Sequence, residues 1–274
     1  MTLCAAAIAG DSQIVTISDT MISGATLQSD GCTLKMEPFA RDWLAMFAGD
    51  DITQCLPVIQ RAKKYFANRA NTVVTARAAF KRAYQQHLNE MKTDVVLNGN
   101  LDMKTFLSSG KRRFTEKVYA ALYERMDAIK SIGTNVAFLI FGFDGEGRPH
   151  IFTVGDQGAD CTFDKPGFCC IGSGMYAADA MLHYFGQAAY KPIYETVFNL
   201  CAAKFMAERN GVGKDTFLYV KQPRSVMSSH KTGLIQEIRD AWESAGAARV
   251  PPGIFEKIVA ADIHTYGAEA DLAQ

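Results

Sequence analysis

Apolar positions recur at two different periods along the chain, and the changes of period divide it into strands and helices. Residues 3–9 are a short apolar run, and residues 13–18 alternate with β-branched residues; both patterns are typical of strands. Gly10-Asp11-Ser12 between them consists of turn-forming residues, so the pair predicts a β-hairpin. The first fifty residues predict one antiparallel sheet, whose further strands are expected near residues 25–28, 32–37 and 43–48.

Apolar residues then change to a helical spacing of three and four positions. The first such stretch runs from Ile52 to Phe66, and Asp50-Asp51 before it can cap a helix and interact with its dipole. The spacing returns over residues 74–92, which predicts a second helix. His87 lies in the apolar stripe of that helix, so we expect a core or interface residue and not a catalytic one.

The interval that follows is polar and rich in turn-forming residues. Asn98-Gly99-Asn100 and Ser108-Ser109-Gly110 predict irregular structure. Apolar residues between Val118 and Ile129 then recur at helical spacing and predict a third helix. We therefore expect a helical insertion at about residues 93–133.

The second half of the chain repeats the order of strands followed by helices. Gly172-Ser173-Gly174 ends the second run of strands, and a helix is expected to begin at Ser173. Pro192 suits the first turn of another helix. The expected strands are 135–143, 151–154, 161–163, 168–171 and, last, 216–220. The helix that begins at Ser173 is expected to bury Tyr176, Ala177, Ala180, Met181 and Tyr184.

The order of strands, two helices, strands, two helices and a strand fits two sheets stacked face to face with helices outside each. We expect an α+β fold in which residues 1–221 form one domain that carries the insertion. Residues 222–274 are expected to form a helical C-terminal extension. It would contain a charged helix over 233–245, a break at Pro251-Pro252-Gly253 and a short second helix.

The composition narrows the classes of partner. The chain has 274 residues, 48% of them hydrophobic, which is enough for a substantial core. Lys and Arg number 29, as do Asp and Glu, so no basic surplus draws the chain to nucleic acid or to an anionic membrane. The first residues lack a secretory signal, and the longest apolar run, near residues 136–143, is too short to span a bilayer. We expect a soluble, cytoplasmic protein.

Metal and cofactor chemistry is not indicated. The seven cysteines form no C-x-x-C pair, and the adjacent Cys169-Cys170 lie in an apolar run, which suits buried thiols. The five histidines show no metal-binding spacing. Gly211-Val212-Gly213-Lys214 is not a phosphate loop, because Glu208 stands where the first glycine is required and Asp215 follows the lysine. We therefore expect no metal and no cofactor.

Thr2 carries the most specific chemistry once two later residues are considered with it. Initiator methionine is generally removed before a residue as small as threonine, which would leave a hydroxyl and a free α-amine on Thr2. An α-amine with a pKa of about 7.7 to 8.0 can accept the hydroxyl proton. Lys35 on a neighbouring strand would lower this pKa, and Asp19 would hold Lys35 in place. Each also has a structural alternative, Asp19 as a strand-end turn residue and Lys35 as an exposed lysine.

Five separated elements of the sequence occur in a distinctive order and spacing. They are Thr2, Ser18-Asp19-Thr20 with Gly24, Lys35, Phe47-Ala48-Gly49, and Ile171-Gly172-Ser173-Gly174-Met175-Tyr176-Ala177. Together they resemble proteasome β-type subunits, and most of all the bacterial members of that group of threonine proteases, which belongs to the N-terminal nucleophile hydrolases. The resemblance covers about residues 2–92 and 135–221.

The resemblance implies a four-layer αββα fold, assembly into stacked rings or a related homo-oligomer, and amide hydrolysis through an acyl-enzyme. Thr2 would attack the scissile carbonyl with its own α-amine as general base. Lys35 and Asp19 would tune that amine. The Gly49 backbone N–H would form the oxyanion hole. Ser173 would hydrogen-bond near the Thr2 amine, or it would act as a plain helix N-cap.

The chain departs from the family pattern in two ways. Many members have an Asp and a Ser before the final strand, whereas residues 208–213 here contain neither in the expected register, and Asn210 is a partial substitute. The insertion and the C-terminal extension also have no counterpart in the simplest members.

The first hypothesis is a threonine-type endopeptidase of a self-compartmentalising assembly that acts on polypeptides. A separate ATPase would unfold its substrates, because this chain has no nucleotide-binding motif. Two alternatives stay open: a catalytically inactive ring or scaffold subunit, and a non-peptidase amidohydrolase with the same nucleophile. Retention of Met1 would favour the scaffold, and activity on small amides but not on peptides would favour the amidohydrolase.

Overall fold

The computed structural model describes most of the chain. The described residues are 2–20, 22–23, 28–29, 35–49, 54–97, 101–132, 136–155, 160–208, 211–225, 228–229 and 232–245. Several features named above lie outside them, namely Met1, Gly24, Asp50-Asp51, the turn at 98–100, Asn210 and the predicted break and helix after residue 250.

The first sheet contains the predicted N-terminal hairpin. Its strands follow the order β10-β1-β2-β11-β12, and every neighbouring pair is antiparallel. The hairpin turn takes a left-handed backbone at Gly10 (φ 55°) and Asp11 (φ 54°), which these two residue types adopt more readily than most. The strands are β1 Cys4–Ala9, β2 Gln13–Asp19, β10 Phe168–Ile171, β11 Thr216–Lys221 and β12 Ser228–Ser229.

The second sheet has the order β5-β6-β7-β8-β9, again antiparallel throughout. The prediction of one sheet for the first fifty residues is therefore wrong, since β2 pairs with β11 while β6 pairs with β7. Hydrophobic alternation identifies a strand but not its partner, and here the partners come from the second half of the chain. The remaining strands are β3 Ile22–Ser23, which pairs with β4 Gln28–Ser29, and then β5 Met36–Pro38, β6 Trp43–Gly49, β7 Val136–Phe143, β8 Pro149–Val154 and β9 Asp160–Thr162.

Strand β1 is buried on both faces. Cys4, Ala6 and Ile8 pack between the two sheets, whereas Ala5 and Ala7 pack toward helices on the opposite side. Because successive side chains of a strand point to opposite faces, both sets must be apolar. This explains why the strand reads as a continuous apolar run.

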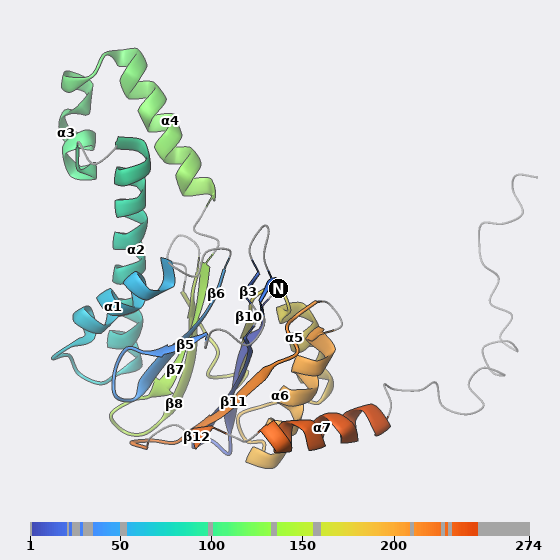
Figure 1. Cartoon of the computed structure of the whole chain (residues 1–274). Coiled ribbons are helices and arrows are strands. Elements are labelled where there is room, and N and C mark those ends of the chain that lie inside the picture. Colours follow the sequence, from blue (N-terminus) through green and yellow to red (C-terminus); the bar gives the residue numbers. More distant parts are fainter. Residues whose placement is uncertain are drawn as a thin grey trace, which may run out of the picture.

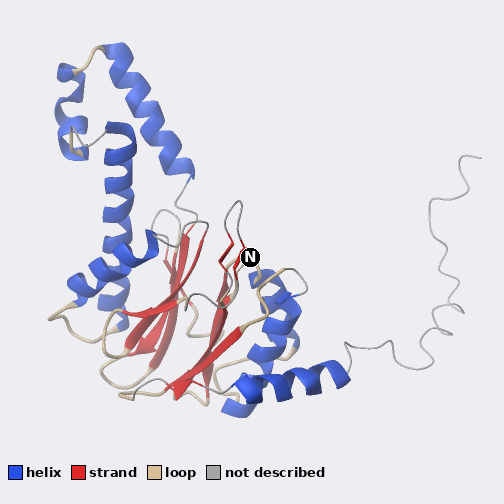
Figure 2. Ribbon diagram, in the orientation of Figure 1, coloured by secondary structure: helices blue, strands red, loops and turns tan. Residues whose placement is uncertain are grey.

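Helices cover the outer face of each sheet and complete four layers (Figures 1 and 2). Helices α1 and α2 pack on the second sheet, α5 and α6 pack on the first, and α7 packs on α6 and β11. The α+β fold with helix, sheet, sheet and helix layers is confirmed. None of the described helices is both long and apolar enough to cross a membrane. The helices that pack on the sheets are α1 Cys55–Phe66, α2 Val73–Leu97, α5 Met175–Tyr184 and α6 Ile193–Glu208, together with α7 Thr232–Ala245.

Two further helices, α3 (Met103–Arg113) and α4 (Glu116–Ile132), project beyond the sandwich from the end of α2 (Figure 1). They pack with the end of α2 around a small core that contains Leu97, Phe106 and Met126. The prediction of irregular structure at 108–110 is wrong, because α3 runs through it. Gly110 is needed for packing and not for a turn: a Cβ there would lie 2.8 Å from the Tyr119 ring.

Helix α5 begins at Met175 and not at Ser173, and the predicted buried face is also wrong in part. Tyr176 and Tyr184 are 78% and 74% exposed. The fully buried residues are Ala178 and Leu182. A stripe of tyrosines at helical spacing mimics an apolar face, but the hydroxyl of each ring favours contact with water.

Candidate active site

The backbone of Thr2 is held by the glycine turn that follows β10. The Gly174 N–H donates a hydrogen bond to the Thr2 carbonyl oxygen at 3.1 Å. Gly172 has a left-handed φ of 94°, and a Cβ at this position would lie 2.3 Å from that same oxygen. Only glycine meets both conditions, so the turn fits closely around the first described residue of the chain.

The Thr2 hydroxyl meets the side chain of Lys35. Lys35 lies just before β5, is 1% exposed, and its Nζ donates to Thr2 Oγ1 at 2.7 Å. Lys35 is therefore not the exposed lysine that its alternating sequence also allowed. An ammonium group this close stabilises negative charge that develops on the hydroxyl oxygen.

Asp19 holds Lys35 in place from the end of β2. Its two carboxylate oxygens each lie 3.0 Å from Lys35 Nζ, and Oδ1 also accepts the Leu3 N–H at 2.8 Å. Asp19 is fully buried. A buried carboxylate requires a counter-charge and hydrogen bonds, and Asp19 has both, which a strand-end turn residue would not need.

Ser173 contacts the other end of Thr2. Its Oγ accepts a hydrogen bond from Thr2 N at 2.9 Å. The N-cap of α5 is Gly174, and no side chain caps the helix there. Ser173 therefore lies where it would contact a free Thr2 α-amine, and it is not the helix cap.

Gly49 ends β6, where it is paired opposite Val136 of β7. Ala48 before it lies next to the glycine turn, since a Cβ on Gly172 would be 3.4 Å from the Ala48 Cβ. Phe47 donates its N–H to the Lys35 carbonyl oxygen at 3.2 Å. These contacts bring the end of β6 beside Thr2 and Lys35, so Gly49 stays the candidate oxyanion donor.

Two charged residues near this site escaped the sequence analysis. Lys204 is fully buried in α6, and its Nζ bonds the carboxylate of Glu208 one turn later. The only sequence signal is a lysine within an otherwise apolar stripe with an acidic residue four positions on, which is common on helix surfaces.

Within the described ranges, no group of three or more His, Cys, Asp or Glu side chains is placed to hold a metal ion.

Comparisons with known proteins support the fold. No family model matches the sequence, and no curated protein does. Among solved structures, Anbu (ancestral beta-subunit) from Yersinia bercovieri matches with a TM-score of 0.63 at 11% identity, over 97% of this chain and 100% of that one. The Gly-1 mutant of Anbu from Hyphomicrobium sp. strain MC1 matches with a TM-score of 0.61 at 12% identity, over 98% and 100%. The chain thus shares the fold of these proteins along nearly its whole length.

Proposed function

We propose that the chain is a threonine-type endopeptidase of the N-terminal nucleophile class. The observation that carries this proposal is the hydrogen bond from Lys35 to the Thr2 hydroxyl, with Lys35 itself fixed by the buried carboxylate of Asp19. A purely structural threonine has no need of a buried lysine on its hydroxyl. The fold shared with an ancestral beta-subunit adds support.

The reaction begins when removal of Met1 frees the α-amine of Thr2. This amine takes the proton of the hydroxyl, and the oxygen attacks the carbonyl carbon of the scissile amide. The Gly49 N–H donates a hydrogen bond to the oxyanion of the tetrahedral intermediate. As the carbon–nitrogen bond breaks, the α-ammonium returns its proton to the leaving amine. An ester between Thr2 and the acyl part of the substrate remains, and water hydrolyses it in a second, equivalent sequence.

Lys35 and Asp19 contribute through charge and position. The Lys35 ammonium favours the neutral form of the nearby α-amine, which is the form that acts as a base. Asp19 keeps the lysine directed at Thr2, and Ser173 Oγ orients the amine. Lys35 and Ser173 contact Thr2 from two different parts of the chain, and Asp19 fixes Lys35, so the nucleophile is held in one orientation.

The proposal extends to assembly and partners. We propose a cytoplasmic homo-oligomer, in line with the name beta-subunit that one structural relative carries. Its substrate would be an unfolded polypeptide supplied by a separate ATPase. The inactive scaffold and the small-amide hydrolase are the outcomes against which this proposal is tested.

The test is the intact mass of the purified protein with and without a threonine-directed epoxyketone. For the wild type we expect the mass without Met1 and one covalent adduct. The adduct should also form in Thr2→Ser but not in Thr2→Ala. Both variants allow removal of Met1, so they form a matched pair. A retained Met1 without adduct would favour the scaffold. An adduct together with turnover of small amides but of no peptide would favour the amidohydrolase.

A further inference from the structure

Lys204 is a buried cation that the proposed mechanism does not use. It is 0% exposed, and its Nζ donates to Glu208 Oε1 and to the Gly213 carbonyl oxygen, both at 2.6 Å. A buried ammonium is costly unless it is paired, so a hydrophobic residue would serve packing better at this position.

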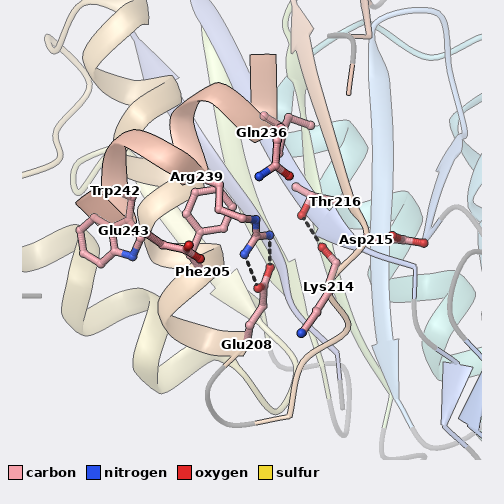
Figure 3. A pocket seen from close by; sticks show the side chains of 10 residues that line it. Phe205, Glu208, Lys214, Asp215, Thr216, Gln236, Arg239, Trp242 and Glu243 are labelled. Atoms are coloured by element: carbon pink, nitrogen blue, oxygen red, sulfur yellow. Dashed lines mark hydrogen bonds and ion pairs between the residues drawn. The ribbon is translucent and has the colours of Figure 1, made fainter. Parts of the chain in front are cut away.

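The same carboxylate joins the C-terminal helix α7 to this group. Arg239 of α7 forms a bidentate ion pair with Glu208, in which Nη1 lies 2.7 Å from Oε2 and Nη2 lies 2.8 Å from Oε1. Its guanidinium lies 4.0 Å from the centre of the Phe205 ring. Figure 3 shows this pair at a cavity of about 560 Å³ that is lined by α6, α7 and the start of β11. Helix α7 is thus tied to Lys204 through one shared acidic side chain.

A first path leads from Lys204 to Ser173 through packing. The bond to the Gly213 carbonyl fixes the loop that contains Val212. Val212 packs against Gly174, since a Cβ there would lie 2.6 Å from Val212 Cγ2 and 3.2 Å from Ala207 Cβ. Gly174 follows Ser173 and bonds Thr2 directly. A displaced Gly213 would therefore disturb the turn that holds Thr2.

A second path leads from Lys204 to Asp19 through charge. Helix α6 packs on β2, and Thr216, three residues after Gly213, is paired opposite Asp19. Burial lowers the pKa of Lys204, whereas Glu208 and Asp19 act in the opposite direction. Two more titratable groups interact with Lys204, namely Arg239 of α7 and the thiol of Cys201. Asp19 is thus bonded to the buried Lys35 and also interacts with the charge of a second buried lysine, Lys204.

We propose that Lys204 is a positioning residue of the Thr2 site, and that Arg239 makes helix α7 part of the same charged unit. Lys204 fixes the loop that packs against the turn after Ser173, and it adds positive potential at Asp19. Arg239 balances the negative charge of Glu208, which would otherwise cancel the charge of Lys204. The catalytic meaning of this inference rests on the proposed function. Its effect on the Thr2 amine does not require activity.

The test measures the pKa of the Thr2 α-amine in full-length protein whose chain starts at Thr2, released from a cleavable N-terminal fusion. Competitive labelling with trace acetic anhydride across pH, read on the N-terminal peptide by mass spectrometry, follows the neutral amine. Lys204→Met and Arg239→Met each remove one positive charge, which favours the protonated amine. We expect the pKa to rise by about 0.5 unit or more in both, and Arg239→Lys to restore it in part.

The control is Arg77→Met, which breaks the Arg77–Asp160 ion pair between α2 and β9. It removes one positive charge remote from the site and should leave the labelling curve unchanged. If Lys204→Met does not fold, Arg239→Met carries the test, because Arg239 is partly exposed. A folded Arg239→Met variant with the wild-type curve overturns the proposal.

Epoxyketone labelling of the same proteins separates this proposal from the proposed function. We expect adduct formation to slow by about tenfold or more in Lys204→Met and Arg239→Met, as for a slightly misplaced nucleophile. A shifted amine pKa without any adduct, even in the wild type, would refute the peptidase and keep the positioning role. Normal adduct rates and an unmoved pKa would refute the positioning role and keep the peptidase.

Discussion

At the scale of single residues, the candidate site depends on which side chains are missing as much as on those present. Gly172 permits the Thr2 carbonyl to approach because it has no Cβ, and its φ of 94° is one that other residues rarely adopt. In the sequence, this glycine belongs to the motif Ile171–Ala177 that resembles proteasome β-type subunits. Its physical task, a close approach to Thr2, became visible only from the fold.

Gly172→Ala tests this close approach against Gly186→Ala. Both glycines have a left-handed φ, but a Cβ on Gly186 would meet no atom within 4 Å, whereas one on Gly172 would lie 2.3 Å from the Thr2 oxygen. We expect Gly186→Ala to cost about 1 to 2 kcal/mol of unfolding free energy, from the backbone conformation alone. Gly172→Ala should cost about 3 kcal/mol or more and abolish the epoxyketone adduct. Urea unfolding and intact mass measure the two effects, and equal costs would contradict the close approach.

The charged residues of the site show the limit of sequence reasoning at this scale. Lys35 and Asp19 were candidates as partners of Thr2, and the family resemblance added Ser173. In the structure Lys35 and Ser173 contact Thr2, and Asp19 contacts Lys35. Lys204 was missed because its partners, Glu208 and the Gly213 carbonyl, are ordinary in sequence. Burial alone makes that lysine unusual, and burial depends on how α6 packs on the sheet.

At the scale of elements, period predicted the type of most helices and strands, but it predicted neither the buried face of α5 nor the existence of α3. Helix α5 turns its tyrosines outward, and α3 crosses a stretch that looked like turns. In α3 the start is set by Asp102, whose side chain accepts the Thr105 N–H at 2.9 Å, as expected of an N-cap. Tertiary contact with α4 then overrides the weak helix preference of Gly110.

Helices α3 and α4 should open independently of the two sheets, because they pack with the end of α2 around a small core that is distinct from the cores of the sandwich. Phe106 is fully buried there and stacks on Tyr119 with ring centres 4.8 Å apart, whereas its neighbour Leu107 is 57% exposed. We expect Phe106→Ala to cost about 3 kcal/mol locally, which corresponds to amide hydrogen exchange about 100-fold faster in α3 and α4. Leu107→Ala should change little. Faster exchange in β1 and β2 as well would show that the two helices do not open independently.

At the scale of the whole molecule, stability should depend on pH through His150. Its Nδ1 lies 2.8 Å from Asp164 and its Nε2 lies 3.3 Å from Asp144. Burial opposes the charged form, but the two carboxylates outweigh it and raise the pKa of His150. A raised pKa in the folded state means that the contribution is complete below about pH 6.5 and is lost as pH rises through the folded value.

His150→Gln therefore should lose more stability relative to wild type in acid than in base. Unfolding free energies at about pH 5.5 and about pH 8.5 give the comparison, with the larger difference expected at the lower pH. His183→Gln is the control, because His183 is 66% exposed and lies 3.9 Å from the carboxylate of Asp179. A difference between His150→Gln and wild type that is the same at both pH values would contradict the raised pKa.

The four-layer arrangement itself was predictable, because it follows from the order of apolar periods and from the need to bury both sheets. The pairing of strands was not. Strand β1 pairs with β10, more than 160 positions later, and a local pattern does not contain such contacts. The partners became clear only when the whole chain was considered together.

The burial of β1 on both faces also determines how Thr2 can move. The strand that begins two residues after Thr2 separates two hydrophobic cores, and it cannot leave its place without opening both. Motions of that kind require nearly the full free energy of unfolding. Local fraying of the sheet is therefore disfavoured at this end of the chain, which restricts the motion of Thr2.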